Sequence, residues 1–330
     1  MTDEKPGTMY HVSSICPAGD HKMACTWYVG SKDCAPDVAI YLSIFDETKS
    51  EWTRPQLLVD SDIASKELDS YVRKVGNSLI YRDGRGRLWL IYASIVVGGW
   101  GGSSLNYKIS VDEGATWSKS EKLILSPIFN LAENVKNKGI NLDDVSFIIP
   151  VYRELGRNYS MALHVDTSGR EINYTITKIS DSINAIQPVL LREDGDNIVA
   201  LFRNSKRLKG SPILFARSSD LGKTWSNVQE TNMANWNSGF DMIQMSDGAY
   251  LGIVNNGIRE NLTIVTSRDG GRNWKPIKVL EKKKDCEYSY PSISRSSSGL
   301  YHVTYSYERK RIKHLVFNEQ WLMQQEGRDH

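Results

Sequence analysis

The chain has 330 residues, 40% of them hydrophobic, so it is long enough to bury a large core. Its 41 basic and 39 acidic residues give a net charge of +2, which argues against general nucleic-acid binding. No hydrophobic run approaches the roughly 20 residues of a membrane span, and the polar segment 1–7 lacks a signal-peptide core. These features favour a soluble, unsecreted protein, although a secreted chain trimmed of its leader would look the same.

Six apolar segments, each preceded by a polar turn, recur along the chain and read as β-strands. They are residues 22–30, 86–93, 145–153, 197–204, 248–255 and 299–307. From the third onward their starts are about 51 residues apart. Repeats of this length that are rich in short strands are typical of radial β architectures.

A second repeat has the pattern S-x-D-x-G-x-T-W. It is intact at 110–117 and 218–225 and has one change at 267–274; weaker copies lie at 164–169 and 43–52. The Asp can accept backbone N–H groups and the Gly can adopt a positive φ, as a tight turn requires. Both repeats predict an all-β fold, a six-bladed β-propeller that takes up residues 1–330 as one domain.

The two ends of the chain are expected to behave differently. The last blade lacks an outer strand, so residues 2–10 are predicted to supply it and close the ring. Residues 318–330 read as a frayed tail. The cysteines, Cys16, Cys25, Cys34 and Cys286, have no metal-ligand spacing and are expected to be free thiols, with proximity of the first two left open.

Loops beside the axis of a propeller are the expected ligand-binding positions. The loop 31–37 of the first blade carries two carboxylates, and the glycine-rich loop 98–102 carries Trp100. No helix is expected after that second loop, so we reject a nucleotide-binding interpretation. Trp100 can stack on a sugar or simply belong to a tight turn. Arg73 and Glu154, at strand ends, are candidate channel residues, and the basic cluster 309–311 follows a strand that can face the channel.

Through the Asp-containing turns and the segment 288–314, the chain resembles the sialidase superfamily, and more closely the bacterial BNR-repeat proteins labelled neuraminidases. In that superfamily the repeated turns are called Asp boxes. The resemblance implies three arginines for the substrate carboxylate, a Tyr nucleophile with a Glu as its base, and an Asp as acid/base. By blade position, Tyr290 matches the nucleophile, and Arg203 and Arg259 match the second and third arginines. Asp33 lies near the place of the acid/base, with Asp37 as the alternative.

Two positions depart from the sialidase pattern. His11 stands where the first arginine is expected, and Gln187 stands where the catalytic Glu is expected. Because Gln cannot take a proton, the tyrosine lacks its usual base, and general-base help contributes roughly 10² to 10⁴ in rate. Three explanations stay open. Glu154, Asp241 or Glu287 can replace the missing base, the substrate can be a different acidic sugar, or the site can bind without turnover.

The resemblance therefore implies an exo-α-sialidase-like glycosidase acting on a terminal acidic sugar, either sialic acid or a related nonulosonic or uronic acid. Tyr290, Asp33 and Gln187 are the candidate catalytic positions. The candidate substrate-binding residues are Arg203, Arg259, His11, Asp37, Arg73 and Glu154. The alternatives are a uronate lyase or atypical glycosidase using Tyr290 and His11, and a propeller that binds acidic glycans without catalysis. No metal or cofactor is indicated, and the expected partner is an acidic carbohydrate rather than nucleic acid or a membrane. The sequence does not indicate an oligomeric state.

Each of these residues also has a purely structural interpretation. The arginines can form inter-blade ion pairs, Tyr290 can be an inner-strand aromatic, Asp33 can cap its loop, and Gln187 beside Pro188 can close a turn.

Overall fold

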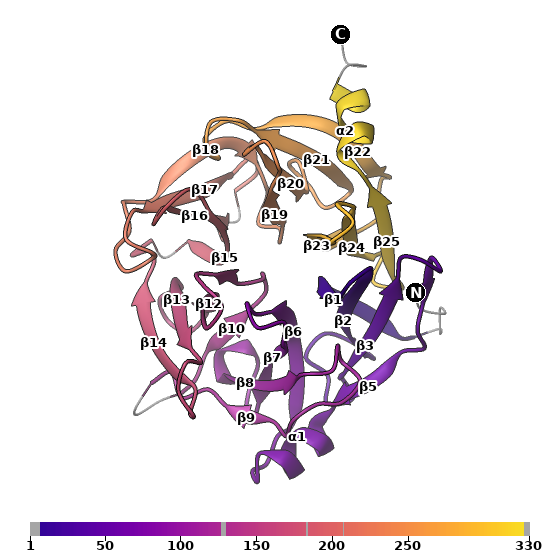
Figure 1. Cartoon of the computed structure of the whole chain (residues 1–330), viewed down its shortest axis with the longest axis vertical. Helices are drawn as coiled ribbons and strands as arrows, with labels where there is room; N and C mark the ends of the chain where they lie inside the picture. Colours follow the sequence, from indigo (N-terminus) through magenta and orange to yellow (C-terminus); the bar gives the residue numbers. More distant parts are fainter. Residues whose placement is uncertain (1–6, 127–129, 183, 207, 327–330) are drawn as a thin grey trace.

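The computed structural model describes residues 7–126, 130–182, 184–206 and 208–326. These residues form six antiparallel sheets. Figure 1 shows the sheets arranged as a ring, with the first strands of the blades near the centre. The prediction of an all-β, six-bladed propeller is therefore confirmed.

Within each blade the strands pair mostly in chain order, from the axis outward. Blade one contains β1 (Met9–Gly19), β2 (Lys22–Gly30), β3 (Ala39–Asp46), β4 (Glu51–Trp52) and β5 (Gln56–Val59). Blade two contains β6 (Lys74–Arg82), β7 (Leu88–Ile95), β8 (Ser103–Ser110) and β9 (Glu121–Lys122). Blade three contains β10 (Glu133–Val135), β11 (Ile140–Asn141), β12 (Ser146–Arg153), β13 (Tyr159–Asp166) and β14 (Asn173–Lys178). Blade four contains β15 (Ala185–Arg192), β16 (Ile198–Asn204), β17 (Pro212–Ser218) and β18 (Gln229–Ala234).

Blade five contains β19 (Asp241–Gln244), β20 (Tyr250–Val254), β21 (Asn261–Ser267) and β22 (Lys275–Lys282). Blade six contains β23 (Tyr288–Arg295), β24 (Tyr301–Tyr307) and β25 (Arg311–Phe317). The helices of the described residues are α1 (Ser61–Glu67), the 3-10 turn η1 (Trp100–Gly102) and α2 (Glu319–Glu326). None of them is long and apolar enough to cross a membrane.

The repeated turns connect the third strand of a blade to its outer segment. In the intact copy after β17, the Asp220 carboxylate accepts the backbone N–H of Thr224 at 2.8 Å and its hydroxyl at 2.6 Å. The Gly222 N–H donates to the Ser218 hydroxyl at 2.8 Å, and the Trp225 indole donates to the Gly222 carbonyl at 3.0 Å. Gly222 has φ of 81°, as the pattern requires. These turns lie at the opposite end of the sheet from residues 185 and 204, which pair with each other.

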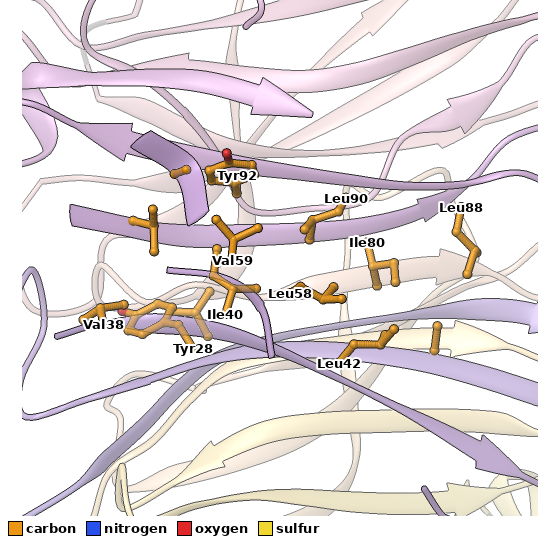
Figure 2. Packing of buried hydrophobic residues seen from close by; sticks show 14 of the residues in the cluster. Tyr28, Val38, Ile40, Leu42, Leu58, Val59, Ile80, Leu88, Leu90 and Tyr92 are labelled. Atoms are coloured by element: carbon orange, nitrogen blue, oxygen red, sulfur yellow. The ribbon is translucent and has the colours of Figure 1, made fainter. Parts of the chain in front are cut away.

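Apolar side chains from neighbouring blades form one cluster at each of the six blade interfaces. Figure 2 shows the cluster between blades one and two, where Tyr28, Ile40 and Leu42 face Ile80 and Leu90. Burying each large apolar side chain contributes roughly 1.5–3 kcal/mol. The blades are therefore held to their neighbours chiefly by the hydrophobic effect.

Blade three is different at the axis. Between β10 and β11 the chain advances five residues, from 135 to 140, while the paired strand β12 advances three, from 148 to 151. The residues in between leave the sheet and reach across the axis. Lys136 donates to the Pro291 carbonyl at 2.5 Å, and the Asn137 amide donates to the Gln187 carbonyl at 3.0 Å. Lys138, which is partly buried, forms an ion pair with the buried Asp241 at 2.8 Å, so one short segment fixes blades four, five and six.

The predictions for the chain ends need correction. Met9 and Tyr10 belong to β1 at the axis of blade one, not to an outer strand of blade six, and residues 2–6 lie outside the described part. The ring is closed instead by direct contacts between blades one and six, such as His302 with Glu47 at 2.7 Å and the Val12 N–H with the Ser306 hydroxyl at 3.1 Å. This packing supplies the contacts that a shared strand was expected to supply.

The predicted frayed tail is, over its described part, the helix α2. Leu322 is buried in the cluster of blades five and six, and Glu319 accepts hydrogen bonds from Tyr301 at 2.7 Å and from Ser246 at 2.6 Å. The helix therefore covers the outside of blade five, where β22 would otherwise be an open edge.

The four cysteines are free thiols. Cys16 pairs with Ala24 and Cys25 with Ile15, so the two thiols belong to opposite faces of the same pair of strands. Among the described residues, no group of three His, Cys, Asp or Glu side chains is arranged to hold a metal ion.

Replacing Lys138 with Ala should destabilise the protein by about 3–5 kcal/mol, because it leaves the buried Asp241 carboxylate without its cation. The measurement is urea-induced unfolding at pH 7. The control is Arg268→Ala, which removes the exposed ion pair with Asp247 and should change stability by less than about 0.5 kcal/mol. Equal effects of the two changes would contradict this account of the axis.

Candidate active site

Four inner strands share a backbone irregularity near their start. In each, the pairing advances by three residues on the inner strand and by two on its neighbour, which makes a β-bulge. One residue within each bulge has positive φ. These residues are Val12 (48°), Asn77 (43°), Gln187 (49°) and Tyr290 (51°). A non-glycine residue in this region costs roughly 1–3 kcal/mol, and such strain clusters at functional sites. Gln187 and Tyr290, two of the sequence-based candidates, therefore occupy equivalent places in blades four and six.

Arg203, next to the end of β16, joins these two positions. Its Nη1 donates to Oε1 of Gln187 at 3.0 Å and lies 3.5 Å from the phenol oxygen of Tyr290. Its Nε donates to Oδ1 of Asn237 at 2.7 Å. The other end of the Gln187 amide donates to the Tyr152 hydroxyl at 3.2 Å. Gln187 thus orients Arg203 with one end and is held by a buried tyrosine at the other.

Arg259 approaches the same tyrosine from blade five. Its guanidinium carbon lies 5.7 Å from the centroid of the Tyr290 ring, and its Nη2 donates to the Asn237 carbonyl at 3.2 Å. Nη1 donates to Glu287 at 3.1 Å. A cation over an aromatic face is attracted by the ring quadrupole. Arg203 at the phenol oxygen and Arg259 over the ring are therefore brought together at Tyr290.

Glu287 links Arg259 to a further arginine, Arg309, in the turn between β24 and β25. Arg309 donates to both oxygens of Glu287, at 2.9 and 3.2 Å. Burial alone would raise the pKa of Glu287, but the hydrogen bonds and charge of Arg309, together with Arg259, lower it to about 2. Glu287 is therefore an ionised bridge between two guanidinium groups.

The ring of Tyr290 is packed on two further sides. His11 contacts it edge to face with centroids 4.9 Å apart, and a Cβ added to Gly239 would lie 2.8 Å from the Cδ1 atom of Tyr290. His11 is 1% exposed, and its Nδ1 is 2.9 Å from the Ser306 hydroxyl. Burial, with the charges of Arg309 and Arg259, lowers the pKa of His11 to about 3. His11 is therefore a neutral packing residue and does not replace the missing arginine as a cation.

The blade-one loop contributes Asp33, which is exposed and accepts a hydrogen bond from the buried Tyr28 hydroxyl at 2.9 Å. Tyr28 in turn contacts His11 edge to face, with centroids 5.8 Å apart. The loop therefore faces the group around Tyr290. Asp37 accepts from the backbone and hydroxyl of Ser31 at 2.9 and 3.0 Å, so it closes the loop.

Glu154 follows Arg153 at the end of β12. Residues two apart on a strand share a face, so Glu154 is on the face of Tyr152, whose hydroxyl contacts Gln187. Within the described residues its carboxylate has no hydrogen bond or ion pair, and burial raises its pKa above the usual range, partly offset by Arg203. Arg73 is exposed at the start of blade two, and its guanidinium has no such contact with the described site residues.

Sequence reasoning did not identify Arg309, Asn237, Gly239 or Tyr152 as site residues. Arg309 was visible only as part of the basic cluster 309–311, which was expected to follow a strand and to be able to face the channel. Its pairing with Glu287 spans 22 residues and two strands. The remaining three act through contacts between blades, for which no local pattern exists. Trp100 is partly buried over Gly76, whose added Cβ would lie 2.8 Å from the indole.

The sequence matches the model of a family described as a BNR repeat-like domain over residues 21–303. The chain belongs to the BNR repeat-like family. A search of curated proteins finds no match. The fold of this chain is similar to that of solved sialidases and trans-sialidases.

The Hadza microbial sialidase Hz136 has a TM-score of 0.78 at 16% identity, covering 95% of this chain. This chain spans 66% of Hz136, just under two thirds of its length. The intramolecular trans-sialidase from Ruminococcus gnavus, in complex with oseltamivir carboxylate, has a TM-score of 0.73 at 14% identity, with 95% of both chains covered. The leech intramolecular trans-sialidase has a TM-score of 0.75 at 12% identity, with 98% of this chain and 71% of the other covered. At these identities the likeness concerns the fold.

Replacing Glu287 with Gln should destabilise this BNR repeat-like protein by about 1–2 kcal/mol at pH 7, because two guanidinium groups lose their shared anion. The folded pKa of about 2 lies below the ordinary value of 4.5, so the stabilisation is present above pH 4.5 and is lost as the pH falls through 2. Denaturant unfolding between pH 7 and pH 2 measures the difference between the two proteins. A difference that stays constant over this range would contradict the assigned ion pairs.

Proposed function

We propose that the protein is a sialidase-like glycoside hydrolase that releases a terminal acidic sugar, sialic acid or a related nonulosonic or uronic acid, from a glycan. The observation that carries the proposal is the meeting of Arg203 and Arg259 at Tyr290, with Arg309 joined to Arg259 through Glu287, so that arginines from the edges of three blades gather there. The guanidinium group of arginine can donate two parallel hydrogen bonds to a carboxylate and carries the opposite charge. The likeness of the fold to sialidases and intramolecular trans-sialidases supports it.

In the proposed reaction the arginines bind the carboxylate of the sugar, and the Tyr290 oxygen attacks or stabilises the anomeric carbon. Asp33 gives its proton to the leaving oxygen as the glycosidic bond breaks. When Tyr290 attacks, its phenol proton passes to the base. Water then displaces the Tyr290 oxygen from the anomeric carbon and gives one proton to Asp33, while the base returns the phenol proton, so the released sugar has gained the elements of one water. Tyrosine is a recognised exception to the usual pair of carboxylates in glycosidases.

The tyrosine needs a base, and the three carboxylates considered from the sequence differ in availability. Asp241 is held in the buried ion pair with Lys138, and Glu287 is paired with two arginines. Glu154 has no such partner among the described residues, and its pKa is raised by burial. Glu154 is therefore the base in this proposal, in place of the absent Glu at position 187.

The second candidate is a propeller that binds an acidic glycan without turnover. It is favoured by Gln187, whose amide is engaged at both ends and can take no proton. The lyase alternative, which would use Tyr290 and His11, is weaker, because His11 is buried with Nδ1 beside the Ser306 hydroxyl.

Tyr290→Phe and Arg259→Ala should each lower kcat/KM by at least 10²-fold, because one removes the nucleophile and the other a carboxylate ligand. The assay incubates purified protein with sialosides, related nonulosonic acid glycosides and uronate oligosaccharides and detects products by mass spectrometry. Arg157→Ala, which removes an exposed arginine, is the matched control and should leave the rate unchanged. Binding of an acidic glycan that depends on Arg259, with no product from any substrate, would favour the binding protein. An unsaturated product absorbing in the ultraviolet would establish the lyase.

Glu154→Gln should lower kcat by roughly 10²- to 10⁴-fold through loss of general-base catalysis. Because the base acts when deprotonated, wild-type activity should rise with pH through a pKa above the ordinary value of 4.5 for Glu. The variant should lose this rise, which a pH–rate profile from pH 4 to pH 8 measures. The matched control is Glu171→Gln, at an exposed position outside the site. An unchanged profile in Glu154→Gln would show that another group is the base.

A further inference from the structure

Three loops at the end of the propeller that carries the candidate site expose aliphatic side chains. Each loop joins the second strand of a blade to its third, and their described residues are 96–102 in blade two, 154–158 in blade three, and 205–206 with 208–211 in blade four. The most exposed apolar residues on them are Val97 (73%), Leu155 (55%) and Leu208 (66%). Exposed apolar residues that are scattered singly are normal, but these three recur at the same place in consecutive blades.

The three residues stand at loop tips that project away from the rest of the protein. A glycine with positive φ follows each of them within two residues, so that the chain turns back there: Gly98, Gly156 and Gly210. At each of these glycines, an added Cβ would have no heavy atom within 4 Å apart from its chain neighbours. The loops of blades two and three still support each other, because a Cβ added to Gly101 would lie 3.3 Å from Cδ1 of Leu155.

Basic side chains lie beside each tip: Lys74 beside Val97, Arg157 beside Leu155, and Lys206 and Lys209 beside Leu208. The Lys74 ammonium is held at its loop by a hydrogen bond to the Gly98 carbonyl at 2.9 Å. The other three cations are exposed and make no ion pair within the described part of the chain. The carboxylate on the described residues of these loops is Glu154, which is partly buried. The tips therefore combine apolar groups with an excess of positive charge.

A lipid bilayer fits this surface better than a protein partner does. A stable protein interface has a contiguous, well-packed core, whereas these apolar tips stand singly on separate loops with basic groups beside them. A bilayer accepts each tip separately, while long basic side chains stay at the level of anionic headgroups. Attachment at the interface needs no spanning helix, because it depends on inserted apolar area and on attraction to anionic lipids.

We propose that this end of the propeller docks on an anionic lipid bilayer, with Val97, Leu155 and Leu208 inserted among the lipids. The inference replaces the expectation from the sequence that a membrane is not a partner. It goes beyond the proposed function and does not depend on it, since the three residues lie outside the group around Tyr290. The candidate site lies at the same end, so the docked protein turns that site toward glycans carried at the membrane surface.

The test is sedimentation of the purified protein with vesicles of phosphatidylcholine containing about 30% phosphatidylserine, and with vesicles of phosphatidylcholine alone. The wild type should bind the mixed vesicles at least tenfold more tightly, and salt at about 0.5 M should weaken that binding. Val97→Ser/Leu155→Ser/Leu208→Ser should lower the affinity for mixed vesicles at least tenfold. Lys206→Gln/Lys209→Gln should reduce the preference for mixed vesicles over phosphatidylcholine.

The matched control removes three exposed apolar side chains elsewhere, from the Asp-containing turn of blade two, from β22 and from α2: Val111→Ser/Val279→Ser/Met323→Ser. This variant should bind vesicles as the wild type does. Circular dichroism and urea unfolding establish that each variant is folded.

A wild type that binds neither kind of vesicle overturns the proposal, and so does an equal loss of binding in the control variant. A dimer in sedimentation velocity that the tip substitutions abolish, without vesicle binding, would instead make this end an interface between two copies of the chain. Vesicle binding is measured without a glycan substrate, so its failure is distinguishable from failure of the hydrolase proposal.

Discussion

The ion pair of Lys138 with Asp241 is the interaction on which the axis of this propeller depends. The Asp241 side chain is buried and Lys138 is partly buried, so without the lysine the carboxylate would be a buried charge that lacks its cation. The ion pair anchors the segment 136–138 across the ring, so that Lys136 reaches the Pro291 carbonyl and Asn137 reaches the Gln187 carbonyl. The Gln187 carbonyl belongs to the strained bulge of blade four, and the Pro291 carbonyl directly follows Tyr290 in the bulge of blade six. The hydrogen bonds made by the segment 136–138 at the axis therefore also hold the backbone of the candidate site.

This arrangement explains how strained residues persist at the site. Gln187 and Tyr290 both have positive φ, at a cost of roughly 1–3 kcal/mol each. An isolated bulge would relax, but here the backbone of each bulge accepts a hydrogen bond from Lys136 or Asn137 of blade three. The side chains of Gln187 and Tyr290 are also held in place. Arg203 bonds the Gln187 amide, and Gly239 leaves room for the Tyr290 ring. The strain turns these two side chains toward the arginines, which a regular strand with alternating side chains would not do.

The features that the sequence predicted are those specified by local chemistry. The turn around Asp220 is determined by a few neighbouring residues, so its repetition indicated a repeated unit, and the six recurring apolar segments gave the number of blades. Arg203 and Tyr290 were found because they occupy fixed places within a repeat. Arg309 was not assigned to the site, because its position depends on Glu287 and on the closing of the ring, and the helix α2 was missed because its stability comes from packing of Leu322 on other blades. Local signals predict elements, whereas pairing between blades is a property of the whole ring.

The substitution at position 187 changes the electrostatics of the site as well as its proton transfer. A Glu there would be an anion within reach of the Arg203 guanidinium, which is 3.0 Å from the present amide oxygen. The neutral amide also accepts a hydrogen bond from Arg203 but brings no negative charge to it. Glu287 compensates one charge of the pair Arg259 and Arg309, so the three guanidinium groups retain a net positive charge at the point where the proposed carboxylate binds. In a partly buried site this excess strengthens the attraction for an anionic sugar. Gln187 in place of a Glu therefore removes a base near Tyr290 and at the same time favours anion binding. In the proposed reaction the phenol proton of Tyr290 passes instead to Glu154, a carboxylate from another blade.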